Sequence, residues 1–453
     1  VLCAKPSEPP YGDFDFSRNS AATRVNAQGL VENVQVLSSN LVQNGDFSEE
    51  GSEEVSNGSF SQEGAEQVTN GDFATDSDWN KSASATISSG VATLTANASN
   101  VFIYQTLWVA NAFTNKTVKV TYTIISNTLD AGKFTINGLG GNDFSLEVVV
   151  PQTVGTHSVY IPVLDRAGSD NRFAFVLNSE ATSGSISIDN CSVREVGQDW
   201  TLGTGWSIAE DKAVAVSGAS SRLEQSISGL SGKTCKVSFT LSDYGGSGSV
   251  YVDFGSVNSD LINTNGEHVV YGTFDQNNFE LFKGAAFSGS ITNISVKEVG
   301  QNWDLGTRWS IGEDKAISDA TQGYIVQTDV GGAGVTATYK IQWEQNITAG
   351  TRLRFFARNY NDGGNATILS ITRDDGLNIG GGNCVGSGTF TAYVSSTNGY
   401  SFKLLAEAGV EADITNITTI QITDDTNLPR INYEGFSYQD ALGSELVTNG
   451  DFA

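Results

Sequence analysis

The sequence predicts an all-β protein made of tandem antiparallel β-sandwich modules. Apolar and polar residues alternate in short runs between glycine-rich turns, the pattern of strands that bury one face. A phrase also recurs four times, as LVQNGDFS (41–48), EVSNGSFS (54–61), QVTNGDFA (67–74) and LVTNGDFA (446–453). Such a repeated phrase indicates a modular array.

The composition favours strands over helices. The 453 residues include 50 Gly and 6 Pro, and 17% of them are charged. The abundant Thr, Val and Ile suit pleated surfaces, and glycine supplies positive φ in tight turns. At about 150 residues per domain, the length allows roughly three domains, each with its own core.

The charge balance limits the partners. Lys and Arg number 25 against 51 Asp and Glu, a formal charge of −26, which repels phosphate backbones and anionic lipid surfaces. No apolar run approaches the roughly 20 residues that span a bilayer. We therefore expect neither nucleic-acid binding nor membrane insertion.

The cysteines do not form a repeated framework. Cys3, Cys191, Cys235 and Cys384 occupy positions that differ from module to module, which excludes a disulfide pattern within each module. We expect buried thiols in a protein assembled in a reducing compartment.

Three modules begin near residues 70, 197 and 300. Each opens with two aromatic residues six positions apart, and each closes with a similar strand, SISIDNCSV, SITNISV or DITNITTI. About eight short strands in each module predict a two-sheet sandwich. The opening pairs are Phe73 and Trp79, Trp200 and Trp206, and Trp303 and Trp309.

Before the first module the phrase repeats at a period of 13 residues (41–53, 54–66, then 67 onward), and residues 49–69 are rich in Glu, Gly and Ser. Two extra copies of one strand cannot bury a face by themselves. The segment is therefore predicted to be a duplicated acidic linker, mobile or draped along a neighbour.

The segment FDFSRNSAATRVNAQGLVENV (14–34) resembles one found near the N-terminus of tailed-bacteriophage structural proteins, especially fibres and adhesin-like proteins. In those proteins a phrase like NLPRINYEG usually follows at once, whereas here it occurs at 427–435. The resemblance implies one small split β unit, in which residues 30–34 pair with residues 430–433. The three modules would then be inserted into its loop.

The modules resemble carbohydrate-binding jelly rolls of the xylan- and glucan-binding kind. The residues that carry this resemblance are the opening NGDF with Trp79 downstream, the strand that ends at Gln105, and the closing SIDNCSV. It implies a β-sandwich with a sugar-binding groove, and often a structural calcium.

Candidate calcium ligands are Asp72 and Asp189 in the first module, because Ca²⁺ takes oxygen ligands from loops. An acidic solvated surface is the competing interpretation. Thr292 and Thr415 replace Asp189 in the later modules, so any such ion is expected in the first module alone. No other cofactor is expected.

Catalytic groups are not expected. The only histidines, His157 and His268, occupy one place in adjacent modules, and Phe390 takes that place in the third. A position that accepts either ring acts through packing. No pair among the 51 acidic residues stands out for glycoside hydrolysis. We therefore expect that the chain is not an enzyme.

Glycan binding needs exposed aromatic rings flanked by amides and carboxylates. Trp108 follows the Gln105 strand at a turn and has no counterpart in the other modules. With Tyr104, Tyr244 and Tyr360, it forms the candidate glycan-binding set, and the competing interpretation is aromatic residues at protein contacts. Four other tryptophans are predicted to be core residues: Trp79, Trp206, Trp309 and Trp343.

The predicted organisation has seven parts. They are the N-terminal segment of the split unit (1–48), the acidic linker (49–69), sandwiches at 70–196, 197–299 and 300–425, the returning segment of the split unit (426–440), and the start of a fourth module (441–453).

These features predict a virion structural protein of a tailed phage: a fibre, an appendage or a capsid-decorating protein. It would be assembled in the host cytoplasm, lie on the virion surface in contact with other virion proteins, and bind host or environmental glycans through many weak contacts. Resemblance to phage fibres implies a homotrimer. Two alternatives remain open: glycan-targeting modules of a secreted bacterial enzyme or surface protein, and a purely structural extracellular filament subunit.

Overall fold

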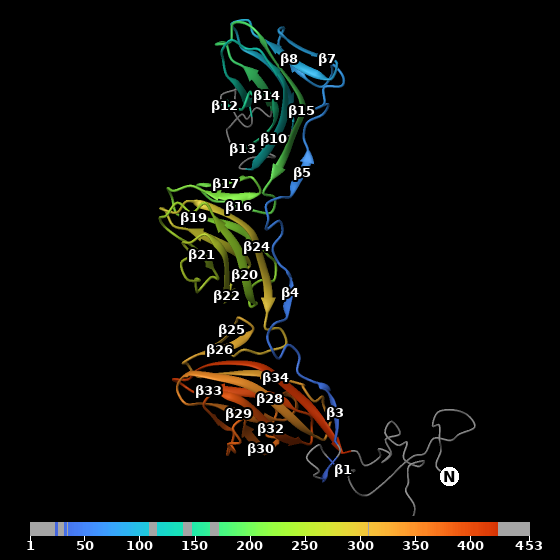
Figure 1. Ribbon diagram of the computed structural model, residues 1–453, viewed down its shortest axis with the longest axis vertical. Helices are drawn as coiled ribbons and strands as arrows, with labels where there is room; N and C mark the ends of the chain where they lie inside the picture. The colour runs from blue at the N-terminus through green and yellow to red at the C-terminus, as the bar shows by residue number, and fades with distance from the viewer. Residues whose placement is uncertain are drawn as a thin grey trace, which may run out of the picture. The chain divides into compact units, whose positions relative to one another are not determined.

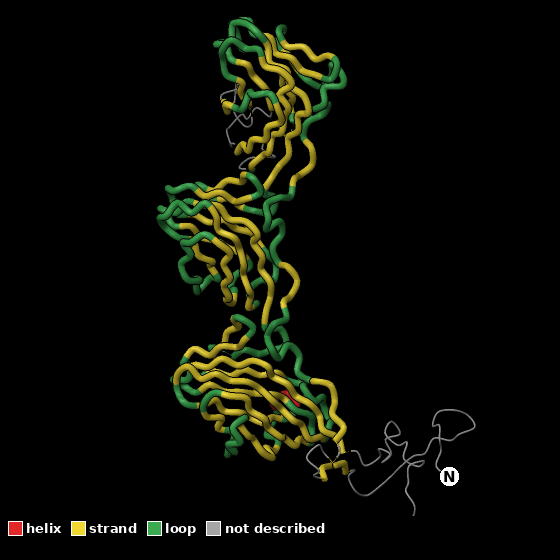
Figure 2. The backbone as a smooth tube through the Cα atoms, in the orientation of Figure 1, coloured by secondary structure: helices red, strands yellow, loops and turns green. Residues whose placement is uncertain are grey.

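The computed structural model describes residues 23–25, 31–33, 35–107, 116–138, 147–163, 172–306 and 308–424. These residues form antiparallel sheets, with one short 3-10 helix, η2 (Tyr360–Asp362), in the described part (Figures 1 and 2). The all-β prediction is confirmed. None of the described helical segments is long and apolar enough to cross a membrane.

The chain divides into two compact units. One consists of residues 1–47, 302–309 and 314–453, and the other of residues 48–301 and 310–313. The second unit holds two sandwiches and the first holds one.

The first sandwich packs a sheet of order β13-β10-β15-β8-β7, with β5 paired to β15, against a sheet of order β12-β11-β14-β9-β6. Its strands are β5 (Glu63–Glu66), β6 (Asn80–Lys81), β7 (Ala85–Ser88), β8 (Val91–Thr95), β9 (Val101–Thr106), β10 (Thr117–Asn127), β11 (Phe134–Gly138), β12 (Glu147–Val149), β13 (Gly155–Pro162), β14 (Arg172–Leu177) and β15 (Ser185–Val196).

The second sandwich has a larger sheet of order β17-β18-β24-β20-β22, with β4 paired to β24, and a smaller sheet of order β16-β19-β23-β21. Its strands are β4 (Glu50–Glu53), β16 (Thr201–Leu202), β17 (Trp206–Ala209), β18 (Lys212–Ala215), β19 (Ser221–Ser226), β20 (Thr234–Ser242), β21 (Val250–Asp253), β22 (Gly266–Thr273), β23 (Asn278–Lys283) and β24 (Gly289–Val299).

The third sandwich includes a larger sheet with the order β26-β34-β28-β32-β30, in which β3 also pairs with β34, and a smaller sheet of order β27-β33-β29-β31. Its strands are β3 (Gln35–Asn40), β26 (Lys315–Asp319), β27 (Gly323–Gln327), β28 (Ala337–Ala349), β29 (Arg352–Arg358), β30 (Thr367–Arg373), β31 (Asn383–Val385), β32 (Gly388–Ser396), β33 (Ser401–Ala406) and β34 (Glu411–Asp424), and β25 (Trp309–Gly312) precedes β26.

The predicted split β unit is described only in its N-terminal half. There β2 (Val31–Asn33) pairs with β1 (Thr23–Val25). The returning segment 426–440, its predicted pairing through residues 430–433, and the start of a fourth module at 441–453 lie outside the described residues.

Of the two alternatives predicted for residues 49–69, the segment lies along neighbouring sandwiches, but it is more than a linker because it supplies a strand to each of two of them. Strand β4 pairs with β24, and β5 pairs with β15, as Figure 1 shows. Val55 and Phe60 lie in the core of the second sandwich, and Val68 and Phe73 in the core of the first. The copies bury a face because each lies on a different sandwich.

The N-terminal strap, which we define as residues 35–73, contributes a strand to each sandwich. Along the chain it reaches the third sandwich first, then the second and then the first. Its first copy of the phrase contacts the third sandwich, where the ring centroids of Phe47 and Trp303 lie 5.2 Å apart. The second copy places Phe60 5.1 Å from Trp200, and the third places Phe73 5.2 Å from Trp79. Each sandwich therefore receives a strand from the strap. In the sequence, the segments of the second sandwich enclose the first sandwich, and the segments of the third sandwich enclose the second.

This nesting corrects the predicted alignment of the tryptophans. The residue equivalent to Trp79 is Trp200 and then Trp303, since each stacks on the phenylalanine of its own phrase. Trp206 instead begins β17, at the place that Ala85 takes in β7 of the first sandwich. The core prediction for Trp79, Trp206, Trp309 and Trp343 is confirmed, since each is buried.

The phrase NGxF is a turn whose residue types follow from its backbone. Asn57 and Phe60 have φ of 50° and 57°, in the left-handed region that Asn tolerates better than most residues. A Cβ on Gly58 would lie 1.9 Å from the carbonyl oxygen of Ile294, so only glycine fits there. The same close approach occurs at Gly45 and Gly71.

Side chains from each sandwich hold the phrase in place. The amide of Gln225 accepts a hydrogen bond from the backbone N–H of Ser56 (2.7 Å) and donates one to its carbonyl (2.9 Å). Gln105 makes the same pair with Thr69, and Gln327 with Gln43. In each module, the glutamine at the end of the predicted strand therefore holds the strap through two hydrogen bonds to its backbone.

At every thirteenth position, a side chain of the strap itself accepts hydrogen bonds from backbone N–H groups. Glu66 Oε1 accepts hydrogen bonds from the backbone N–H groups of Val68 (3.0 Å) and Val193 (2.8 Å), which join the strap to β15. Glu53 does the same with Val55 and Val296, and Asn40 with Val42 and Thr419. The 13-residue period is thus the period of these contacts.

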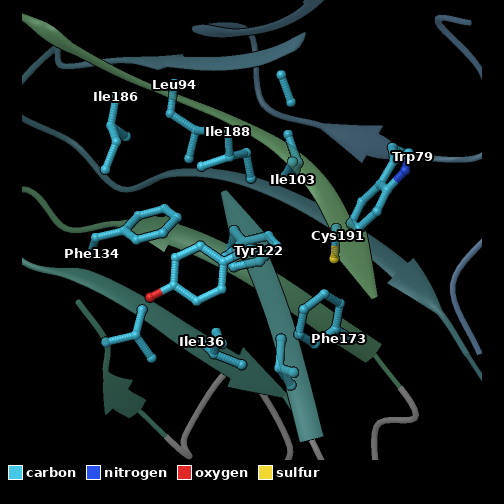
Figure 3. Close-up of a cluster of buried hydrophobic side chains, with 14 of the residues drawn as sticks. Trp79, Leu94, Ile103, Tyr122, Phe134, Ile136, Phe173, Ile186, Ile188 and Cys191 are labelled. Carbon is cyan, nitrogen blue, oxygen red and sulfur yellow. The ribbon is translucent and has the colours of Figure 1, made fainter. Parts of the chain in front are cut away.

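The core of the first sandwich is aromatic and aliphatic (Figure 3). Tyr122 is fully buried edge-on to Phe134 and Phe175, and its hydroxyl donates to the carbonyl of Pro151 at 2.6 Å. A fully buried large apolar side chain contributes about 1.5–3 kcal/mol. The core therefore gives the smaller sheet a rigid support for its opposite face.

Candidate functional site

Each smaller sheet presents one face to its core and an opposite face, here called the outward face. On the first sandwich, the pairing register places Asn137 opposite Ala174, and Ala174 opposite Tyr104. Glu147 on β12 and Asn80 on β6 extend this row at its two ends. The row thus combines a carboxylate, two amides and an aromatic ring.

Tyr104 has a defined setting on this face. Its ring is half-buried, the guanidinium carbon of Arg172 lies 5.4 Å from its centroid, and the ring of Phe102 lies 6.1 Å away. Asn137 is nearly buried, and its Oδ1 accepts a hydrogen bond of 2.6 Å from Thr135. Fixed amides beside an aromatic ring are groups that suit sugar hydroxyls and a pyranose face.

The other glycan candidates are dispersed. Trp108 lies outside the described residues. Tyr244 is in the second sandwich and Tyr360 in the third, so the structure does not bring these side chains together with Tyr104.

Tyr244 was predicted to be exposed, but its side chain is partly buried. Its ring packs against the core beside Phe287, with centroids 6.0 Å apart, and its hydroxyl donates to the carbonyl of Gly248 at 2.8 Å. Tyr360 begins η2 and is half-buried, and its backbone N–H donates to the carbonyl of Asn398. Among the described members of the set, Tyr104 is the one that the strand register places on an outward face.

The calcium candidates have local backbone partners. Asp72 Oδ1 accepts from the N–H of Ala74 at 3.3 Å, and Asp189 Oδ1 from the N–H of Asn190 at 2.6 Å. Among the described residues, no three His, Cys, Asp or Glu side chains are grouped to hold a metal ion. Thr292, which replaces Asp189, donates instead to the carbonyl of Asp211.

The histidines pack as predicted. The ring of His157 lies 5.6 Å from Tyr122, and that of His268 lies 5.8 Å from Phe239. Each Nε2 also contacts a backbone carbonyl of the preceding turn at 2.7 Å. In the third sandwich, Phe390 stacks on Trp343 at the same place. This position is part of the packing.

The described cysteines are buried free thiols, as predicted; Cys3 lies outside the described residues. Burial raises the pKa of Cys235 and of Cys384 to about 12, and raises that of Cys191 well above its usual value. A thiol must ionise to act as a nucleophile, so these groups are inert at neutral pH.

The outward face of the second sandwich was missed by the sequence analysis. Tyr251 and Phe282 stack with centroids 5.0 Å apart, and Arg222 lies over Phe282 at 5.9 Å. Arg222 also forms an ion pair with Glu280 (2.8 Å), whose pKa is raised by burial. The available signal was an aromatic residue on the polar side of an alternating strand, as in VYVD.

Comparison with known proteins gives the following. No protein-family model and no curated protein sequence matches the chain. Among solved structures, the N-terminal CBM22 tandem of a Paenibacillus barcinonensis protein is 11% identical, with a TM-score of 0.25, covering 52% of this chain and 99% of that one.

Two further structures are similar at the same level. Tandem CBM51 modules of a Streptococcus pneumoniae family 98 glycoside hydrolase are 10% identical (TM-score 0.17), covering 49% of this chain and 97% of that one. A triple jelly-roll protein of an archaeal virus is 11% identical (TM-score 0.20), covering 75% and 90%. Likenesses at these TM-scores and identities carry no argument about the family, role or ligand of this chain.

Proposed function

We propose that this chain is a non-catalytic structural protein of a tailed-phage virion whose sandwiches bind glycans through their outward faces. The observation that carries glycan binding is the row of Glu147, Asn137, Tyr104 and Asn80 across the smaller sheet of the first sandwich. On one side of the half-buried Tyr104 ring Asn80 is exposed, whereas on the other side Ala174 and Asn137 are buried and Glu147 is exposed at the end of the row.

The nested strap supports the structural part of the proposal. Each sandwich is held by a clamp of glutamine and tryptophan hydrogen bonds to a strand from the N-terminal strap. Sandwiches that are each held by contacts between residues far apart in the sequence suit an exposed appendage. The resemblance of residues 14–34 to phage fibre and adhesin segments supports the virion assignment.

Binding is tested with the full chain on immobilised neutral xylans and glucans. We expect weak binding that Tyr104→Ala reduces about tenfold, because a stacked ring contributes on the order of 1 kcal/mol beyond its area. Tyr104→Phe should retain binding, since the ring is kept.

Tyr393→Ala is the matched control, because Tyr393 is also half-buried and lies on β32 of a larger sheet. Equal binding by the Tyr104→Ala and Tyr393→Ala chains would remove the first sandwich as the site. No binding to any glycan would leave a purely structural role.

The virion assignment is tested on purified phage particles. We expect the chain in their protein inventory, accessible to antibody on intact virions, and a trimeric mass for the isolated protein. Detection in a secreted bacterial fraction without particles would instead support the glycan-targeting modules of an enzyme or surface protein.

A further inference from the structure

The outward face of the third sandwich is basic. Strand β29 carries Arg352, Arg354, Phe356 and Arg358 at alternate positions, so all four side chains lie on one face. Lys403 on β33 is directly opposite Phe356. Four cations are thus gathered on one sheet of a chain whose net charge is −26.

Aromatic rings organise these cations. The guanidinium carbons of Arg354 and Arg358 lie 4.9 Å and 5.4 Å from the centroid of Phe356, so one ring holds both. The Lys403 Nζ lies 4.2 Å from the centroid of Tyr324, which is 36% exposed. The side chains of Arg352 and Arg354 are each 40% exposed. The charges are therefore held in place and remain reachable.

Two carboxylates lie at the edges of the face in the described residues: Glu407, and Asp304, which bridges to Val326 in the row of Lys403 and Phe356. Glu407 lies 3.3 Å from Arg352 and 3.5 Å from Arg354. Arg358 Nη1 donates to the amide oxygen of Asn365 at 3.1 Å. The four cations of the face outnumber these two carboxylates. Like charges placed this close gain from an anion between them.

The same face differs in charge between sandwiches. In the second sandwich the corresponding strands β19, β21 and β23 carry Glu224, Asp253 and Glu280, with Arg222 as their cation. In the first they carry Asn137 and Tyr104, with Arg172 beside the Tyr104 ring. The cores are alike and the faces are not, which indicates that each face is adapted to a different partner.

We propose that the outward face of the third sandwich binds a linear glycan that carries carboxylate groups, such as a polyuronate. Alternate residues of a strand repeat every 6.6 Å or so, so Arg352, Arg354 and Arg358 form a line of cations. A linear polyanion of sugars matches that line, and the exposed part of Tyr324 offers a ring surface beside it. Arginine forks bind carboxylates with paired hydrogen bonds.

A second copy of the chain is the other acidic partner to consider. Its acidic outward face is a poorer match, because Glu280 is 5% exposed and already paired with Arg222. A polymer with free carboxylates is therefore favoured.

The test uses the full chain and polygalacturonate, with the fully methyl-esterified polymer as the uncharged probe. We expect binding to polygalacturonate alone. It should weaken between about 0.1 M and about 1 M NaCl, which shortens the screening length from about 10 Å to about 3 Å. The Arg354→Gln/Arg358→Gln chain should bind at least about tenfold more weakly, since each charged hydrogen bond is worth roughly 1.5–3 kcal/mol.

Arg308→Gln/Lys340→Gln is the control, because it removes the same charge from the third sandwich outside this face. Equal weakening in both double variants, equal binding to the esterified polymer, or no binding would overturn the proposal. Self-association that Arg354→Gln/Arg358→Gln abolishes would assign the face to a second copy instead.

This inference rests on the outward faces being glycan-binding surfaces, but its readout is separate from that of the first sandwich. Tyr104→Ala should leave polygalacturonate binding unchanged, and Arg354→Gln/Arg358→Gln should leave neutral-glycan binding unchanged. If one of the two sites does not bind its glycan, the measurement on that site shows it, and the measurement on the other site is unaffected.

Discussion

The indole Nε1 of Trp200 donates a hydrogen bond of 3.0 Å to the carbonyl oxygen of Asn57, a residue 143 positions earlier in the chain. The same carbonyl accepts the backbone N–H of Phe60 and so closes the NGSF turn. Trp79 bonds to Asn70 and Trp303 to Asn44 in the same way. Each sandwich is therefore locked to its copy of the repeated phrase, and its stability depends on the N-terminal strap.

Trp200→Phe should destabilise the second sandwich by about 1–3 kcal/mol, because it removes the donor to Asn57 and keeps an aromatic ring beside Phe60. Chemical denaturation followed by intrinsic fluorescence measures the free energy of unfolding.

Trp206→Phe is the control, since the buried Nε1 of Trp206 has no hydrogen-bond partner among the described residues. Losing that donor costs nothing, so its effect should be smaller by at least about 1 kcal/mol. Equal destabilisation by both changes would mean that the bond to Asn57 is unimportant.

Gly58→Ala should destabilise the second sandwich by about 1–3 kcal/mol or more, because the new Cβ would meet the carbonyl oxygen of Ile294 at 1.9 Å. Gly284→Ala, in the same sandwich, meets its nearest atom at 3.6 Å and should have little effect. Thermal denaturation of the two variants compares them. A Gly58→Ala chain as stable as the Gly284→Ala chain would contradict the close approach of the strap to β24.

Acid should weaken the pairing of β4 with β24. Hydrogen bonds from Lys236 (2.7 Å) and Lys297 (2.8 Å) hold the pKa of Glu50 below its usual 4.5. A carboxylate with a lowered pKa in the folded state stabilises it above about pH 4.5, and the effect is lost as pH falls through the folded pKa. The urea midpoint of the second sandwich should therefore fall as the medium is acidified from pH 5.

Glu50→Gln should flatten this dependence on pH and lower the midpoint at neutral pH. Glu267→Gln, an exposed residue of β22, serves as the control and should leave the profile unchanged. If the Glu50→Gln profile matches that of the unchanged chain, the two lysine contacts do not contribute to stability.

The copies of the phrase should be interchangeable. Replacing EVSNGSF (54–60) with QVTNGDF, the sequence at 67–73, keeps the turn, the glycine and the phenylalanine. It removes the ion pair of Glu54 with Lys233 (2.6 Å), a partly exposed contact worth about 1 kcal/mol or less. Limited proteolysis and denaturation should show the second sandwich folded and almost as stable. Unfolding of that sandwich would mean that each copy is specific to its own acceptor.

Several features could be read from the sequence because they depend on local patterns. The alternation in VKVTYTI and CKVSFTL predicts β10 and β20, and both strands bury every other residue. The shared position of His157 and His268 predicts packing, which their aromatic contacts confirm.

Other features required the fold. The aromatic pairs of equal spacing suggested that Trp79 matches Trp206, whereas the partner of Phe60 is Trp200. The basic face of the third sandwich was missed, because Arg354 and Lys403 are distant in sequence and meet only through the register of β29 and β33.

The sequence by itself determined that the chain is all-β, that sandwich modules begin near residues 70, 197 and 300, and that the NGxF phrase recurs. Only the tertiary structure decided which sandwich each copy joins. The physical reason is that alternation shows that a strand has a face to bury but says nothing of where the covering surface lies. The repeats at a period of 13 residues suggested a linker. In the structure they form the strap, because Gln225, Trp200 and Ile294, which come much later in the chain, make hydrogen bonds with its second copy.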